Sequence, residues 1–156
     1  MKKIFIFLFF CALLGCSKES QNQKPVIIPN RAYQWRMDIE EFNVPEGTTS
    51  IGEYAFSGCT NLKSITIPNS VTKIGNNVFN GCYYLKSITL PSELTNIGEY
   101  AFYYCRSIDS IYIPKSVTKI GTFAFGKCEN LTLIIPKQFE GNEELGLEFC
   151  KEVIYY

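Results

Sequence analysis

The sequence contains no histidine among its 156 residues. Histidine is the most frequent general base in catalysis and a common transition-metal ligand, so the residue that most often carries these functions is missing. The sequence also lacks an excess of positive charge, with 15 basic and 15 acidic side chains. A nucleic-acid-binding domain normally presents a basic surface, so we expect no nucleic-acid partner.

The remaining nucleophiles and acids form no catalytic pattern. Serines are plentiful, but no histidine is available to activate one. Glu40 and Glu41 are adjacent, and adjacent residues on a strand point to opposite faces, so these two carboxylates cannot face each other across a substrate. We therefore predict no catalytic residue, no cofactor and no enzymatic activity.

The one long hydrophobic run lies at the N-terminus. Residues 1–16 read MKKIFIFLFFCALLGC, in which two lysines precede an apolar stretch that is too short to span a bilayer. This pattern predicts a secretory signal peptide over residues 1–15. Its end, LLGC, resembles the lipobox of bacterial lipoproteins. The resemblance implies cleavage before Cys16 and acylation of its thiol, and the alternative is an ordinary signal peptide followed by an unmodified cysteine.

A polar segment follows the predicted cleavage site. Residues 16–30 contain almost no apolar side chain up to Pro25, which predicts a flexible tether. The lipid on Cys16 would hold the protein at the membrane, because each buried methylene contributes about 0.8 kcal/mol. The resemblance to lipoproteins thus implies a location in the cell envelope, at the outer membrane, with the periplasmic and the extracellular leaflet both open.

The rest of the chain is organised by one pattern that occurs four times with a constant 23-residue period. Each copy has a proline, an Ile-Gly pair, a phenylalanine and a cysteine at fixed positions; the cysteines are Cys59, Cys82, Cys105 and Cys128. A period of about 20 to 29 residues with recurring leucine and isoleucine is the signature of a leucine-rich solenoid, in which each repeat adds a strand to a stack. We therefore predict an α/β fold class: a short leucine-rich-repeat solenoid of about five units, with parallel strands, short helical turns and capped ends.

The second copy, residues 68–90, illustrates one unit. Residues 70–74 predict a short extended segment, and the apolar spacing over residues 78–82 predicts about one helical turn that packs inward. Residues 85–90 predict the strand of the stack, which ends at the next proline because proline cannot donate to a ladder.

Atypical copies at both ends are expected to cap the solenoid. We assign residues 31–44 to the N-terminal cap, with Tyr33 and Trp35 covering the open end of the core, or with Trp35 stacking on a ligand as the alternative. Residues 45–136 hold the four clear copies. Residues 137–156 hold a degenerate fifth copy, which we assign to the C-terminal cap with its glutamates toward solvent.

The repeat resembles the BspA-like, or Treponema-type, leucine-rich repeat family, whose 23-residue unit carries the same P..V..IG..AF.GC..L..I.I pattern. The resemblance is close over residues 39–136 and looser over residues 137–156. Members of this family are commonly secreted or surface proteins of host-associated bacteria and anaerobic protists, and some are implicated in adhesion and in binding host matrix proteins. The signature residues are the buried ones, so they account for the fold and not for a partner.

Five cysteines follow Cys16, at one position of successive units. Side chains at one repeat position are spread along a line at about 4.8 Å per step and do not converge on a point, so we predict no metal site. Free, buried thiols are the expected arrangement, and a disulfide between neighbouring units is the alternative.

Two sets of residues outside the core pattern are candidates for a binding surface. The first is the outer face of the strand stack, roughly 24 Å across for six strands, with the candidate residues Glu41, Asn43, Ser64, Thr66, Ser87, Thr89, Ser110 and Tyr112. The second is a group of tyrosines near the cysteine turns: Tyr54, Tyr83, Tyr84, Tyr100, Tyr103 and Tyr104. Tyrosine suits contact because it combines a large rigid body with a polar tip, but packing over the turns is an equally good explanation.

These observations predict a non-catalytic, lipid-anchored cell-envelope protein whose repeat surface binds a protein of the host or of a bacterial surface. The alternative is a glycan-binding or structural accessory lipoprotein of the envelope. Binding to matrix proteins favours the first function, and binding to polysaccharides alone favours the second.

Overall fold

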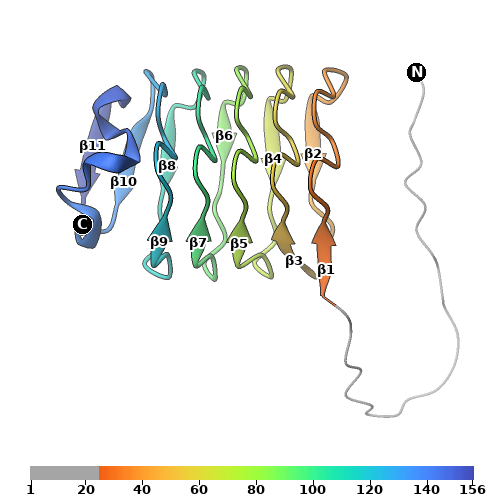
Figure 1. The fold of residues 1–156 in the computed structure, drawn as a ribbon, viewed down its shortest axis with the longest axis horizontal. Coiled ribbons are helices and arrows are strands. Elements are labelled where there is room, and N and C mark those ends of the chain that lie inside the picture. The colour runs from red at the N-terminus through yellow and green to blue at the C-terminus, as the bar shows by residue number, and fades with distance from the viewer. Residues whose placement is uncertain (1–24) are drawn as a thin grey trace, which may run out of the picture.

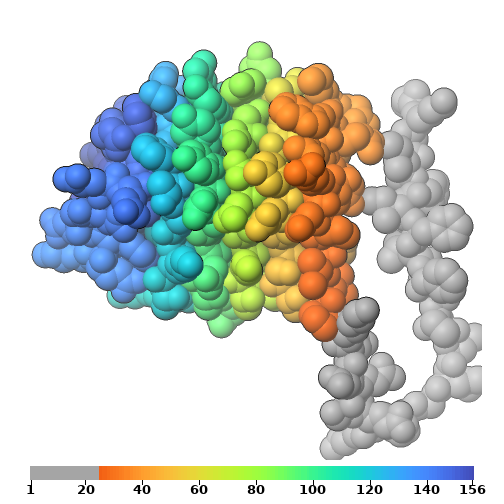
Figure 2. All heavy atoms as spheres, in the orientation of Figure 1, coloured from red at the N-terminus to blue at the C-terminus, as the bar shows by residue number. Residues whose placement is uncertain are grey.

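The computed structural model describes residues 25–156, which form one parallel β-solenoid (Figure 1). The predicted signal peptide, Cys16 and the first part of the tether lie outside the described residues. Successive turns stack along the long axis of the molecule, and the space-filling view shows them as adjoining bands from one end to the other (Figure 2). The predicted short solenoid is therefore confirmed.

One side of the solenoid carries the strands that the leucine-rich segments were expected to form. These are β2 (Glu41–Asn43), β4 (Ser64–Thr66) and β6 (Ser87–Ile88) in one sheet, and β8 (Ser110–Tyr112), β10 (Thr132–Ile135) and β11 (Glu152–Tyr155) in another. All pairs are parallel, and their register is that of the repeat, because Glu41 pairs with Ser64 and Ser64 with Ser87. Between the two sheets the Asp109 N–H donates to the Lys86 carbonyl at 3.4 Å, so the stack continues across the division.

The opposite side carries one five-stranded parallel sheet, which we call the second sheet because the two sheets of the strand face form one continuous stack. Its strands are β1 (Val26–Ile28), β3 (Thr48–Ile51), β5 (Lys73–Ile74), β7 (Asn96–Ile97) and β9 (Lys119–Ile120). The extended segment predicted at residues 70–74 ends in β5. Its pairing into a sheet of its own follows from the repeat, since the same two residues of each unit meet at every step.

The solenoid begins earlier in the chain than predicted, at strand β1. The expected boundary between tether and cap was residue 30, but residues 26–28 pair with β3 and the Ile28 side chain is buried. The physical reason is that Ile28 lies one 23-residue step before Ile51 and covers the same apolar column at the end of the stack.

Turns close each unit where short helical turns were expected. In the second unit the Phe79 N–H donates to the Ala101 carbonyl at 2.8 Å, and the Gly81 N–H donates to the Tyr103 carbonyl at 2.9 Å. These N–H groups bond to the next repeat and form a third ladder along the solenoid, while others close the turn itself, as the Cys82 N–H does by donating to the Phe79 carbonyl at 3.0 Å. Among the described residues the helices are η1 (Lys137–Phe139), η2 (Glu143–Leu145) and η3 (Leu147–Phe149), all 3-10, and none has the length and apolarity needed to cross a membrane.

A phenylalanine column fills the centre of the solenoid. Its four rings have no exposed surface, and neighbouring ring centroids lie 5.7, 5.3 and 5.6 Å apart along Phe56, Phe79, Phe102 and Phe125. Burying one such side chain contributes roughly 1.5–3 kcal/mol. Because each ring is covered by the rings of its neighbours, no unit can bury its own core alone.

The cysteines form a parallel column beside the rings. The five cysteines after Cys16 are free, and four of them are buried, so the expected free thiols are found and the alternative disulfide is not. Each buried thiol donates to a carbonyl of the preceding unit, as Cys105 Sγ does to Phe79 O at 3.2 Å. Burial raises the pKa of Cys59 to about 11 and that of Cys128 to about 12, so these thiols stay protonated and unreactive at neutral pH.

The repeated glycine after each isoleucine sets how closely the turns approach. A Cβ added to Gly98 would lie 2.5 Å from both the carbonyl carbon and the carbonyl oxygen of Gly75 in the preceding turn. A side chain at this position would therefore force neighbouring units apart, which explains why glycine occupies it in every full copy.

The two caps differ from the expected arrangement at one residue. Tyr33 covers the N-terminal end of the core as predicted, with its ring stacked on Phe56 at 5.0 Å and 4.6 Å from Phe42. Trp35 does not, because 64% of its surface is exposed, so the prediction that it covers the core is wrong. At the other end Phe139 is buried, and the glutamates of the degenerate copy are exposed as predicted: Glu140, Glu143, Glu144 and Glu148.

Candidate functional site

The structure places the eight predicted residues of the strand face on one side of the molecule. Strand pairing puts Glu41, Ser64 and Ser87 in one column and Asn43 beside Thr66 in the next. All of the eight are exposed except Ser64, which is half-buried. Short hydroxylic side chains dominate this face, so over most of its area it lacks the aromatic and arginine anchors of tight protein interfaces.

The C-terminal end of the strand face is more apolar than the sequence indicated. Ile134 and Ile154 continue the column of Tyr112, and the ring of Tyr156 stacks on that of Tyr112 at 5.1 Å. The Tyr156 hydroxyl donates to the Ile113 carbonyl at 2.6 Å, and burial raises the pKa of Tyr156 to about 12. Sequence reasoning missed this extension because the fourth unit is one residue shorter, which takes these residues out of the 23-residue step.

Four of the six predicted tyrosines lie in one continuous set of ring contacts, which we call the tyrosine cluster. Centroid distances are 6.3 Å from Tyr83 to Tyr104, 4.6 Å from Tyr104 to Tyr103 and 5.3 Å from Tyr103 to Tyr100. All three contacts are edge-to-face, which is a favoured geometry for aromatic pairs. The guanidinium of Arg106 lies 5.1 Å from the centre of the Tyr104 ring, so the cluster carries an arginine at its margin.

The other two predicted tyrosines stand outside the tyrosine cluster. The Tyr54 ring is half-buried and has the Arg31 guanidinium 5.2 Å from its centre. Tyr84 is 58% exposed and takes part in no aromatic pair of the described region. The structure therefore divides the predicted set into a connected group of four and two separate rings.

Two columns of left-handed backbone run along the turns that carry these rings. One column contains Arg31, Tyr54, Asn77, Tyr100 and Phe123, with φ from +49° to +58°. The other contains Trp35, Gly58, Gly81, Tyr104 and Lys127, with φ from +61° to +75°. Sequence reasoning missed both columns, because the non-glycine residues at most of their positions hide the usual sign of a positive φ.

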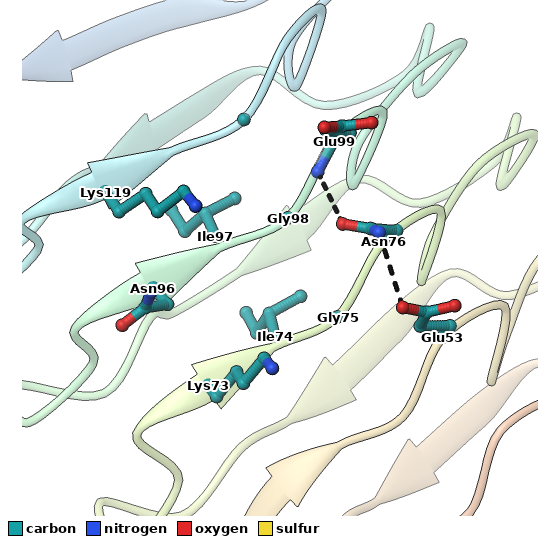
Figure 3. A pocket seen from close by; sticks show the side chains of 11 residues that line it. Glu53, Lys73, Ile74, Gly75, Asn76, Asn96, Ile97, Gly98, Glu99 and Lys119 are labelled. Atoms are coloured by element: carbon teal, nitrogen blue, oxygen red, sulfur yellow. Dashed lines mark hydrogen bonds between the residues drawn. The ribbon is translucent and has the colours of Figure 1, made fainter.

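A shallow groove of about 260 Å³ crosses the ends of β5 and β7 on the second sheet (Figure 3). Its walls carry two lysines, Lys73 and Lys119, and two glutamates, Glu53 and Glu99. Asn76 lies between the glutamates; it donates to Glu53 Oε1 at 3.3 Å and accepts from the Glu99 N–H at 2.9 Å. The groove therefore has no net charge that would select an ion, and its amide is engaged in holding neighbouring turns together.

The described residues give no sign of a catalytic or metal centre. Within residues 25–156 no three histidine, cysteine or acidic side chains come together as metal ligands. The Glu40 carboxylate pairs with Lys63 Nζ at 2.8 Å on the surface, which accounts for one of the two adjacent acids. The candidate sites are therefore three surfaces: the polar strand face, the aromatic turn region and the neutral groove.

The repeat and the solenoid relate this chain to known proteins. A family model described as BspA type leucine rich repeat region matches residues 26–151 in six copies. Solved structures that resemble the chain include a leucine-rich repeat protein from Bacteroides ovatus, with 44% identity and a TM-score of 0.66 over 69% of this chain and 28% of that one. No curated protein matches the chain.

Two further structures extend this comparison. The T. pallidum leucine-rich repeat protein is 25% identical, with a TM-score of 0.73 over 88% of this chain and 66% of its own. A leucine-rich cell surface protein from Faecalibacterium prausnitzii is 31% identical, with a TM-score of 0.63 over 74% of this chain and 32% of its own. The chain thus spans about a third or less of the B. ovatus and F. prausnitzii proteins.

Proposed function

Because the chain belongs to the BspA type leucine-rich repeat family, we propose that it is a non-catalytic scaffold of the cell envelope that binds a partner protein through its tyrosine cluster. The contact between Tyr83, Tyr104 and Tyr103 carries this proposal, since these rings form a connected patch on the turns. Tyrosine and arginine are enriched among the residues that dominate protein interfaces, and Arg106 adjoins the patch.

The strand face is the weaker of the two surfaces for this purpose. Its columns consist mainly of serine and threonine, whose truncation seldom costs much binding energy. The tyrosine cluster can bury large, rigid rings at little cost in conformational entropy, because a tyrosine side chain has only two rotatable angles. Partner binding at the tyrosine cluster is therefore favoured on energetic grounds.

The anchor belongs to the same proposal. Acylated Cys16 would hold the protein at the outer membrane, and residues 17–24 would separate the solenoid from the lipid surface. A place on the outside of the cell agrees with the F. prausnitzii relative, which is described as a cell surface protein. A Cys16→Ser variant should leave the membrane fraction, whereas its retention there would contradict the anchor.

An array of host matrix proteins and polysaccharides tests the binding function. The wild-type chain should bind at least one protein, and the double variant Tyr103→Ser, Tyr104→Asn should bind it at least about tenfold more weakly. Asparagine is chosen at position 104 because it tolerates the left-handed backbone there.

A strand-face variant serves as the matched control. Thr66→Lys with Thr89→Lys adds two charges to exposed positions of that face and should leave binding to the same protein unchanged. Loss of binding in this control but not in the tyrosine variant would move the site to the strand face. Binding to polysaccharides alone would contradict the proposed function and favour a glycan-binding accessory.

A further inference from the structure

A hollow of about 250 Å³ lies on the N-terminal part of the turns, beside the tyrosine cluster. It is lined by two glycines, Gly58 and Gly81, and by three aromatic residues: Trp35, Tyr54 and Tyr83. Polar groups complete the lining: Gln34, Ser57, Thr60 and Asn80. None of the described residues that line this hollow is charged, so its chemistry is that of neutral amides, hydroxyls and aromatic faces.

The hollow exists because two glycines interrupt a column of side chains. Gly58 and Gly81 share the second left-handed column with Trp35 on one side and Tyr104 on the other. At positions 35 and 104 a residue with a Cβ adopts the left-handed backbone, which costs about 1–2 kcal/mol per residue. At position 58 the missing side chain leaves room for the Trp35 indole, and at position 81 an added Cβ would have no atom closer than 3.9 Å, so the space there stays open.

The Trp35 indole is held in place by this arrangement and remains accessible to a ligand. A Cβ at Gly58 would collide with the indole ring, so the ring lies directly against Gly58. Yet 64% of the Trp35 surface is exposed, and the core end is covered by Tyr33. The left-handed backbone at Trp35 is the turn geometry of its whole column, so what sets Trp35 apart is a large apolar ring left in solvent beside other aromatic rings, and exposed apolar surface of this kind marks ligand-binding grooves.

The lining favours one class of ligand. A pyranose ring has an apolar face of C–H groups, which the negative face of an indole attracts, and a rim of hydroxyls that pair with amides and hydroxyls. The Asn80 side chain is already oriented, because its Nδ2 donates to Asn77 Oδ1 at 2.8 Å. With no charge in the lining, an ionic ligand would have no partner to replace its water.

We propose that this hollow binds a neutral sugar residue of a glycan, stacked on Trp35 and hydrogen-bonded by Asn80 and its polar neighbours. This function goes beyond the binding of a protein through the tyrosine cluster and does not depend on it. Extended proline-rich peptides also dock on aromatic rings, but the small volume and the polar groups of the lining favour a sugar ring.

The sole tryptophan of the chain makes the test direct, because Trp35 is the only indole that can respond. Full-length protein in a zwitterionic detergent without sugar headgroups is titrated with tetrasaccharides of glucose, mannose, galactose and N-acetylglucosamine. At least one should shift the emission to shorter wavelength in a saturable way. A decamer of proline serves as the competing probe.

Two glycine variants separate filling of the hollow from a general effect on the fold. Gly81→Asn places a side chain in the hollow, where the nearest atoms to an added Cβ are 3.9 Å away, and it should weaken sugar binding at least about tenfold. Gly47→Asn has a similar φ of +79° with nothing within 4 Å, and it should bind as wild type does. Asparagine is tolerated at such angles in both places.

The outcomes decide the proposal. It is overturned if no tetrasaccharide shifts the emission at about 10 mM, where a Kd corresponds to only about −2.7 kcal/mol of binding free energy, if Gly81→Asn binds as wild type does, or if polyproline alone binds. The array with the tyrosine variants reports on protein binding separately, so either function can fail without the other.

Discussion

Replacing Gly98 by alanine tests whether the spacing of the solenoid depends on its glycine column. The new Cβ would lie 2.5 Å from the Gly75 carbonyl oxygen and 2.6 Å from the Asn76 nitrogen. Favourable contacts between heavy atoms begin at about 3.5 Å. The two units must therefore separate locally by about 1 Å, against a normal spacing of about 4.8 Å.

Separating the two units strains the hydrogen bonds between them, which lowers the free energy of unfolding. The Gly98 N–H donates to the Ile74 carbonyl at 2.9 Å, and the Asn77 N–H donates to the Glu99 carbonyl at 2.8 Å. Weakening one or two such bonds costs about 0.5–1.5 kcal/mol each, and forced overpacking costs about 1–3 kcal/mol. Together these two costs should lower the free energy of unfolding by about 1.5–6 kcal/mol.

Denaturant titration followed by circular dichroism measures this loss, and Gly81→Ala provides the control. At Gly81 the φ of +75° also opposes a Cβ, but the nearest atoms are 3.9 Å away, so only the backbone cost of about 1–2 kcal/mol applies. The glycine column does not set the spacing if the stability of Gly98→Ala differs from that of wild type by less than about 0.5 kcal/mol, or if this variant is less destabilised than Gly81→Ala.

Three further predictions concern the core, the thiols and a surface ion pair. Phe102→Ala should lower the free energy of unfolding by about 3–5 kcal/mol, because the ring is fully buried between two others. The control Tyr84→Ala should change it by less than about 0.5 kcal/mol. Equal effects of the two substitutions would contradict the assigned core. Since the pKa of Cys128 is raised from 9.0 to about 12, the unfolded chain loses this proton first, and stability should fall as the pH rises from 9 toward 12. Denaturant titrations across that range should show a fall shallower by about 1.4 kcal/mol per pH unit in Cys128→Ala, and an unchanged slope would argue against burial of the thiol. The hydrogen bond from Arg36 lowers the pKa of Asp38 to about 2, so an NMR titration of Arg36→Gln should show the Asp38 midpoint moving up toward 3.8, and no movement would exclude the pairing in solution.

The repeat period predicted those parts of the fold in which each unit meets its neighbour in the same way. Ser64 and Ser87 pair as the 23-residue step requires, and the buried cysteine column follows from side chains at one position pointing the same way. The same step also contained the signal for β1, since it separates Ile28 from Ile51. That signal was missed because Ile28 is followed by proline and not by glycine.

The candidate surfaces were less predictable, because they depend on backbone angles that the repeat pattern does not reveal. Tyr104 and Trp35 share their left-handed conformation with Gly58, which only the structure makes visible. The structure was also needed to show that Trp35 is exposed and that Tyr84 lies outside the ring contacts of the tyrosine cluster. A 23-residue period fixes which residues are neighbours, but not how a turn directs their side chains.

Photo-crosslinking in intact cells tests the central claim, that the tyrosine cluster is the protein-binding surface, most directly. p-Benzoylphenylalanine is placed at Tyr103 in one strain, at Thr89 of the strand face in a second and at Lys119 of the second sheet in a third. After irradiation, the first strain should give a covalent adduct to a single protein that the other two lack. An adduct of equal yield at Thr89 or Lys119, or none at Tyr103, would contradict the account.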